Sequence, residues 1–319
     1  MGLIYNYKSL DSIKGGVMDL ISIRRTYNNR KNLIFIVCIL LICVILIITG
    51  TEIVDNRRSK KIYLSYLEQV QNVENEAEER ERLAKEQELK EQEELRKKSP
   101  QLTEEGKNNI ANIYKSETKR VFLTFDDGPS SNVTPIVLDT LKAENIKATF
   151  FLLGGRVELN PELVKREFDE GHYLASHGYS HVYSQIYASP QSVLDEYNNC
   201  IAAIRNAIGM ADYNPHLFRF PGGYWGGKYA DIKKEAATLL DENNIAHIDW
   251  NALTSDAAGA KTTEEFIAEL DKTVPKHNSV VVLMHDAGGK KATAEALPTI
   301  ISYFRNQGFE FDNFYSIIK

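Results

Sequence analysis

Short apolar runs rich in β-branched and aromatic residues alternate with amphipathic stretches from residue 118 to the end of the chain. The apolar runs lie at 121–125, 148–154, 172–177, 217–220, 246–250 and 280–285. Helical patterns lie near 133–144, 161–170, 190–208, 229–243, 263–273 and 292–307. This repetition is typical of a parallel sheet closed or nearly closed into a barrel. We therefore expect an α/β fold, a distorted (β/α) barrel, over 118–319.

A continuous apolar run from Leu33 to Thr49 contains no charged residue. Its length is about that required to cross the hydrocarbon core of a bilayer. A buried core helix fits poorly, because the run is apolar on every face. A cleaved signal peptide is the stronger rival, although no small-residue cleavage site follows. The pattern predicts a transmembrane signal anchor at 33–51, a cytoplasmic tail at 1–32 and an extracellular remainder.

Between about 58 and 99 the chain is dominated by Glu, Lys, Arg, Gln and Leu, all good helix formers. Opposite charges often stand three or four residues apart, a spacing that supports a helix. Leu83, Leu89 and Leu95 recur every six residues, which does not fit the heptad of a coiled coil. A solvated single helix or a weakly self-associating one is expected, and 52–117 is assigned to a helical stalk and linker.

Charge and composition narrow the possible functions. The 319-residue chain has a formal net charge of −6, and no phosphate-binding glycine motif occurs in it. A nucleic-acid binder would be expected to carry a basic face, so this class is disfavoured.

Residues suited to catalysis stand near the carboxyl ends of the predicted strands, the rim where active sites of barrels assemble. They are Asp126, Asp127, His177, Arg219, Asp256 and His285. His177 and His181 are four residues apart, a spacing that can present two imidazoles to one metal ion. Asp126 and Asp127 fit a turn after a strand. They also fit a metal ligand beside a general base, because a cation would offset the repulsion of adjacent carboxylates.

The sequences TFDDGP, SHGYSH, RFPGG and LMHD follow one another in this order. They make residues 118–319 resemble the polysaccharide deacetylases of carbohydrate esterase family 4. The resemblance implies that Asp127, His177 and His181 hold a divalent metal, usually zinc, with cobalt or another divalent ion able to serve. It also implies that Asp126 is the general base that activates water for attack on an acetyl carbonyl.

The same resemblance implies roles for four further residues. The backbone N–H of Gly222 would donate to the oxyanion, and His285 would protonate the departing amine. Arg219 would pair with Asp126 and lower its pKa, while Asp256 would hold His285.

One position departs from the family pattern. Ala257 stands in TSDAAG where the family usually has tryptophan after an aspartate. Loss of that aromatic wall would widen or reshape the substrate groove. Tyr224 and Trp225 could supply a stacking surface instead, although both could equally be packing residues.

Several substrates remain open. The anchor and stalk favour peptidoglycan, in particular its N-acetylglucosamine, as the acetylated polymer nearest the membrane. Exopolysaccharide, chitin-like polymers and O-acetylated xylan are alternatives. A non-catalytic glycan-binding scaffold is the hypothesis from another class, and the presence of all the motif residues argues against it.

Overall fold

The computed structural model describes residues 34–45, 56–98 and 100–318. The chain divides into two units, Met1–Lys85 and Glu86–Lys319, which are described separately. In the first unit, residues 34–45 are helical. Among the described residues, no helix combines the length and the apolar character needed to cross a membrane. The anchor predicted at 33–51 is described only at 34–45, and the predicted tail 1–32 lies outside the described residues.

The charged segment is helical, as its composition predicts. Helix α2 extends from Asn56 to Lys98. Exposed ion pairs join Arg80 to Glu76 and Lys90 to Glu86 along it, at 3.5 and 2.9 Å. These pairs have the i, i+4 spacing that supports an isolated helix.

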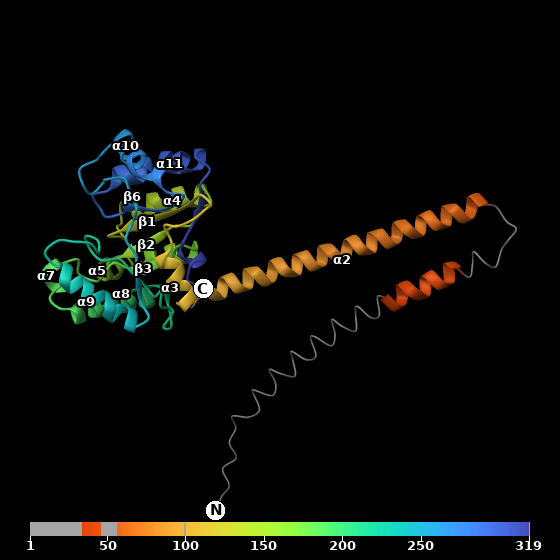
Figure 1. The fold of residues 1–319 in the computed structure, drawn as a ribbon, viewed down its shortest axis with the longest axis horizontal. Coiled ribbons are helices and arrows are strands. Elements are labelled where there is room, and N and C mark those ends of the chain that lie inside the picture. The colour runs from red at the N-terminus through yellow and green to blue at the C-terminus, as the bar shows by residue number, and fades with distance from the viewer. Residues whose placement is uncertain (1–33, 46–55, 99, 319) are drawn as a thin grey trace, which may run out of the picture. The chain divides into compact units, whose positions relative to one another are not determined.

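An eight-stranded sheet forms the centre of the second unit (Figure 1). Its strands are β1 (Arg120–Asp126), β2 (Thr149–Leu152), β3 (Tyr173–Ser176), β4 (Leu217–Phe218), β5 (Ala246–His247), β6 (Ala252–Leu253), β7 (Ser279–His285) and β8 (Glu310–Asp312). Their order is β5-β4-β3-β2-β1-β7-β6, with β8 also pairing with β1, and the pairings are parallel. Among the described strands, none joins β5 to β6. The distorted barrel is therefore open along this side.

The helices predicted from residue 133 onward are found with their ends within one residue of the expected positions. They are α4 (Thr134–Ala143), α6 (Pro161–Asp169), α8 (Pro190–Ile208), α9 (Ala230–Glu242), α10 (Thr263–Thr273) and α11 (Lys291–Asn306). The structure adds α3 (Glu104–Ala111), α5 (Gly154–Leu159), α7 (Tyr183–Ile186) and two short 3-10 helices, Val274–Lys276 and Phe314–Ser316. Local sequence explains the sharp ends of α8: Ser189 accepts a hydrogen bond from the Ser192 N–H, and Gly209 adopts a φ of 73°.

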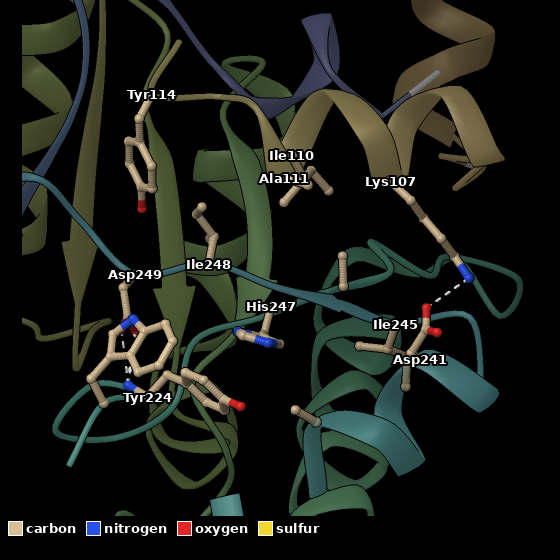
Figure 2. A pocket seen from close by; sticks show the side chains of 13 residues that line it. Lys107, Ile110, Ala111, Tyr114, Tyr224, Asp241, Ile245, His247, Ile248 and Asp249 are labelled. Atoms are coloured by element: carbon tan, nitrogen blue, oxygen red, sulfur yellow. Dashed lines mark hydrogen bonds and ion pairs between the residues drawn. The ribbon is translucent and has the colours of Figure 1, made fainter. Parts of the chain in front are cut away.

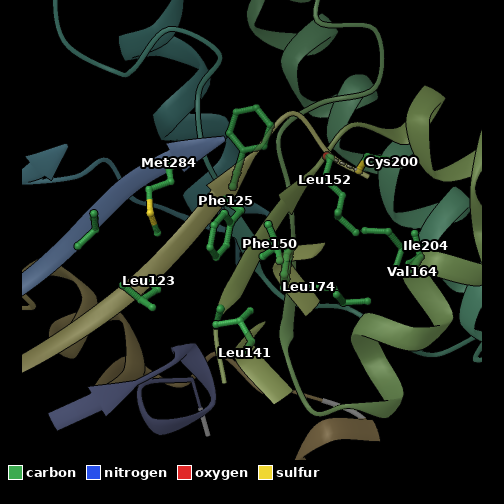
Figure 3. Packing of buried hydrophobic residues seen from close by; sticks show 14 of the residues in the cluster. Leu123, Phe125, Leu141, Phe150, Leu152, Val164, Leu174, Cys200, Ile204 and Met284 are labelled. Atoms are coloured by element: carbon green, nitrogen blue, oxygen red, sulfur yellow. Dashed lines mark hydrogen bonds between the residues drawn. The ribbon is translucent and has the colours of Figure 1, made fainter. Parts of the chain in front are cut away.

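Alternate residues of each strand point to opposite faces of the sheet. On one face Phe125 and Phe150 stack with their ring centroids 5.3 Å apart, within the core that the helices cover (Figure 3). On the other face Phe122 and Phe151 belong to a second buried cluster. Both faces are therefore buried, which explains why the strands read as nearly continuous apolar runs.

Segments from the two ends of the second unit fill the second face. Ile110 of α3 and Ile113 just after it pack there with Phe314 and Ile318. The ring of Phe314 lies 5.5 Å from that of Phe122. The sequence assigned 100–117 to the stalk and linker, whereas the structure packs α3 against the sheet; Thr103, which caps α3 ahead of two glutamates, is its local signal.

Candidate active site

The polar residues predicted at the strand ends converge. Asp126 ends β1 and His285 ends β7, and the two are partners in the parallel pairing of these strands. His177 follows β3, and Asp256 comes three residues after β6. These four residues line one pocket of about 370 Å³. Arg219 lies one residue beyond β4 and is fully buried.

Asp127, His177 and His181 form a cluster that could hold a metal ion. One ligand atom from each residue lies within 4.8 Å of the others. Asp127 Oδ1 is 3.5 Å from His177 Nε2 and 3.3 Å from His181 Nε2. This oxygen is buried, and it accepts no hydrogen bond from the described residues. A buried carboxylate oxygen without a donor is costly unless a cation faces it, so the donor set fits a divalent metal site with open positions.

His177 is oriented as a ligand by its own backbone surroundings. Its Nδ1 lies 2.8 Å from the carbonyl oxygen of Arg219, which can only accept, so Nδ1 carries the proton. Burial lowers the pKa of His177 to about 3, which keeps the ring neutral. Nε2 therefore directs a free lone pair toward Asp127, an arrangement common among metal-bound histidines.

Glu196 of α8 holds the turn between the two histidines. Its carboxylate accepts from the Ser180 N–H at 2.7 Å and the Ser180 hydroxyl at 2.6 Å, and also from the Tyr179 N–H. His181, the next residue, has a left-handed φ of 58°. A fixed turn is needed to keep that conformation. Sequence reasoning missed Glu196, since it lies on an ordinary amphipathic helix.

Arg219 positions Asp126, as predicted. Its Nη1 donates to Asp126 Oδ1 at 2.8 Å and to the Thr124 hydroxyl at 2.7 Å. Its guanidinium stacks on the Phe151 ring at 3.9 Å. The expected net lowering of the pKa of Asp126 is wrong: burial raises it, and although the Arg219 charge works in the opposite direction, the pKa stays above its ordinary value.

His285 and Asp256 form the second predicted pair. His285 Nδ1 lies 2.8 Å from Asp256 Oδ1, and the His285 N–H donates to Oδ2 at 3.0 Å. The Thr293 hydroxyl and the Lys290 ammonium bind the same residue, at Oδ2 and the carbonyl oxygen. Burial works to lower the pKa of His285, but the hydrogen bond and charge of Asp256 outweigh it and raise the pKa. The imidazolium is thus favoured.

Gly222 lies in the pocket wall with a φ of +76°. A Cβ at this position would be 2.5 Å from the hydroxyl oxygen of Tyr183, so the backbone approaches the pocket at a point where no side chain fits. Among the described residues, none accepts a hydrogen bond from the Gly222 N–H. Tyr183 and Trp250 line the pocket together with Ala257. Sequence reasoning did not assign Tyr183 or Trp250 to the site: Tyr183 stands in no motif, and Trp250 was given no role although it lies in the stretch IDWNALTSDAAG around Asp256.

Tyr224 and Trp225 are placed elsewhere. They line a second pocket beside Asp249, and they are not among the residues of the metal pocket. The stacking surface expected of them therefore does not face the metal cluster. The aromatic residues of the metal pocket are Tyr183 and Trp250 instead.

Comparisons with known proteins identify a family and several relatives. The sequence profile of the polysaccharide deacetylase family matches residues 114–239. The peptidoglycan-N-acetylglucosamine deacetylase PgdA of Listeria monocytogenes is 38% identical over 207 residues, which cover 63% of this chain and 40% of that protein. A peptidoglycan-N-acetylglucosamine deacetylase of Bacillus cereus is 34% identical over 204 residues, which cover 62% of this chain and 70% of that protein.

A solved structure shares the fold. The carbohydrate esterase family 4 esterase of Streptococcus mutans superimposes with a TM-score of 0.59 at 32% sequence identity. The match covers 65% of this chain and 90% of that one. The chain thus contains nearly all of that protein but well under half of the Listeria protein.

Proposed function

The chain belongs to the polysaccharide deacetylase family, carbohydrate esterase family 4, and we propose that it removes acetyl groups from the N-acetylglucosamine of peptidoglycan. The observation that carries this proposal is the metal-binding cluster with a carboxylate and an imidazole in the same pocket. Peptidoglycan is favoured because relatives from Listeria and Bacillus are named as deacetylases of this polymer.

Asp127, His177 and His181 would hold the divalent cation, and zinc is the proposed ion. Two neutral imidazoles and one carboxylate are a ligand set typical of catalytic zinc sites. A bound cation would supply a Lewis acid for the acetyl carbonyl and lower the pKa of a nearby water.

Asp126 is suited to take the proton from the attacking water. Its Oδ1 is held by Arg219, so Oδ2 is the oxygen left for the proton, and Oδ2 lies 3.8 Å from His177 Nε2. Burial raises the pKa of Asp126, which makes the carboxylate a better base than an exposed aspartate.

The remaining steps need a hydrogen-bond donor to the oxyanion and a general acid. Gly222 lines the pocket, and its N–H would donate to the oxygen of the tetrahedral intermediate. His285, kept protonated by Asp256, would give its Nε2 proton to the departing amine, which cannot leave as an anion. Together these groups complete an amide hydrolysis.

We also propose that residues 33–51 anchor the protein in the cell membrane with the catalytic unit outside. The uncharged run 33–49 supports this. The full chain should then sediment with membranes and resist extraction by alkaline carbonate. Release into the carbonate supernatant would contradict the anchor without affecting the proposed chemistry.

Acetate release from purified peptidoglycan tests the proposed activity. The full-length protein should release acetate, lose this activity with a chelator and recover it with added zinc. An Asp126→Asn variant should bind zinc but release no acetate above background. Metal-loaded protein that releases acetate from O-acetylated xylan but not from peptidoglycan would refute the proposed substrate, and release from neither would refute the proposed activity.

A further inference from the structure

A second pocket of about 430 Å³ opens on the unpaired side of the sheet, beside β5. Its walls come from α3, from the strand β5 and the residues after it, and from Tyr224 and Trp225 (Figure 2). We propose that this side pocket binds another sugar ring of the polysaccharide whose acetyl group is removed in the metal pocket. The inference rests on the proposed function and extends it to a binding site that the catalytic residues do not include.

The linings of the two pockets come together at two short segments of the chain. Gly222 and Trp250 line the metal pocket, whereas Tyr224, two residues after Gly222, and Asp249, directly before Trp250, line the side pocket. A Cβ on Gly223, between the two, would lie 3.1 Å from the Trp250 ring and 3.8 Å from Asp249 Oδ2. Two residues span at most about 7 Å of chain. A polymer held at the metal pocket can therefore reach the side pocket by passing over this loop.

The side pocket offers aromatic faces. Trp225 is 82% exposed, the most exposed of the large hydrophobic residues that the structure describes. The Tyr224 ring packs against His247, at 4.5 Å between ring centroids and 32° between planes, and meets Trp225 edge to face at 4.9 Å. An exposed tryptophan beside a fixed tyrosine marks a recognition surface rather than a core. Such faces suit the C–H side of a pyranose ring.

Polar groups in the same pocket suit sugar hydroxyls. Both carboxylate oxygens of Asp249 lie 3.0 Å from the Tyr224 N–H, and each retains accepting capacity. Figure 2 shows the Tyr114 hydroxyl directed to the side of the pocket that holds Asp249. Burial raises the pKa of Tyr114, so its hydroxyl remains a donor. Aromatic faces combined with a few placed polar groups are the usual composition of a small-molecule site.

Tryptophan fluorescence can test binding without catalysis. Trp225 and Trp250 are the two tryptophans of the chain, so a Trp250→Phe variant reports Trp225 alone. In full-length, chelator-treated protein, a pentasaccharide of N-acetylglucosamine should change the Trp225 emission, while the free monosaccharide at the same concentration should not. Unchanged emission with the pentasaccharide would overturn the proposal. So would a change caused by a peptidoglycan stem peptide and not by the sugars.

Kinetics on sugars of different length give a second test. Trp225→Ala should raise KM for the pentasaccharide about tenfold with kcat unchanged, the effect of ~1.4 kcal/mol of lost contact. It should leave kcat/KM for the disaccharide as it was. The matched control is Leu159→Ala, which removes a side chain that is 70% exposed but outside both pockets. Equal effects of Trp225→Ala on both lengths would overturn the side pocket while the deacetylase stands. A fluorescence response to the pentasaccharide without acetate release would overturn the deacetylase and leave the side pocket standing.

Discussion

Replacing Asp256 by Asn is expected to move the alkaline limb of the pH profile of kcat/KM to lower pH. The substitution keeps the shape of the side chain but removes the charge that faces His285 Nδ1 at 2.8 Å. That charge and hydrogen bond raise the pKa of His285 against the effect of burial. As an acid, His285 acts only while protonated, below its pKa. A lower pKa therefore means that activity is lost at a lower pH.

The size of the effect follows from the contact. A hydrogen bond to a charged group contributes ~1.5–3 kcal/mol. Because His285 and Asp256 are almost fully buried, little of this is screened by solvent. At alkaline pH the loss in kcat/KM should be about 10- to 150-fold, since each ~1.4 kcal/mol corresponds to a factor of ten. Below the pKa of His285 in the variant, the loss should be much smaller.

The assay is acetate release by the full-length, zinc-loaded protein across the pH range. Thr293→Val is the matched control, since it removes a neutral donor to Asp256 Oδ2 and leaves the carboxylate in place. It should lower activity only a few-fold and leave the limb near its original position. An Asp256→Asn profile that drops uniformly, with no movement of the limb, would refute the reasoning, because Asp256 would then act only as a structural support.

Three further effects are expected. Gly222→Ala should lower kcat by about 100-fold or more, the scale of a lost oxyanion donor, because the new Cβ would lie 2.5 Å from Tyr183 Oη. Glu196→Gln should weaken zinc binding by about 10- to 100-fold in competition with a chelating dye, because it loosens the turn between the ligands. Glu167→Gln should make stability less dependent on pH. Burial, and then the charge of Asp286, raises the pKa of Glu167 well above its ordinary value of 4.5. The folded protein therefore holds this proton more tightly than the unfolded chain and loses stability as the pH rises above 4.5, a loss that the variant should not show.

Matched control variants separate these specific effects from a general loss of folding or stability. Gly209 has a φ of +73°, similar to that of Gly222, but nothing lies within 4 Å of the Cβ that Gly209→Ala would add, so this variant should keep kcat. Glu295→Gln removes an exposed carboxylate on α11 and should change neither zinc affinity nor pH-dependent stability. Urea unfolding followed by tryptophan fluorescence measures the stability of the second unit, which contains both tryptophans. A Glu167→Gln protein with the same pH dependence as the unmodified chain would contradict the third expectation.

The longer elements were predictable because their patterns are local. β1 and β7 read as apolar runs, since both faces of the sheet are buried, and α8 begins and ends at recognisable capping residues. The strands β6 and β8 form no apolar run of their own: β6 has two residues shortly after the run 246–250, and none of the three residues of β8 is buried. The helix α3 was missed although Thr103 caps it, because its eight residues include only two buried ones and show no clear apolar period.

The metal cluster was predictable because its residues stand in sequence motifs, whereas Tyr183 and Glu196 stand in none. His177 and His181 stand four residues apart in one motif, and the resemblance to the deacetylase family added Asp127 as the third ligand. Glu196 acts across sixteen residues on the backbone of Ser180, and Tyr183 meets Gly222 only through the fold. Their contributions depend on tertiary contacts, which no spacing in the sequence encodes. The raised pKa of Asp126 likewise reflects burial, which outweighs the visible partner Arg219.

The segment 219–225 combines three different requirements within a few residues. Arg219 must be fully buried to hold Asp126, and Gly222 must lack a side chain because a Cβ would lie 2.5 Å from the Tyr183 hydroxyl oxygen. Trp225 must be exposed if the side pocket is to hold a sugar. Each requirement affects a separate measurement: the basicity of Asp126, the stabilisation of the oxyanion, and the dependence of KM on substrate length. Substitutions along this one loop should therefore alter these quantities one at a time, whereas a loop that served only packing would lose all of them with stability.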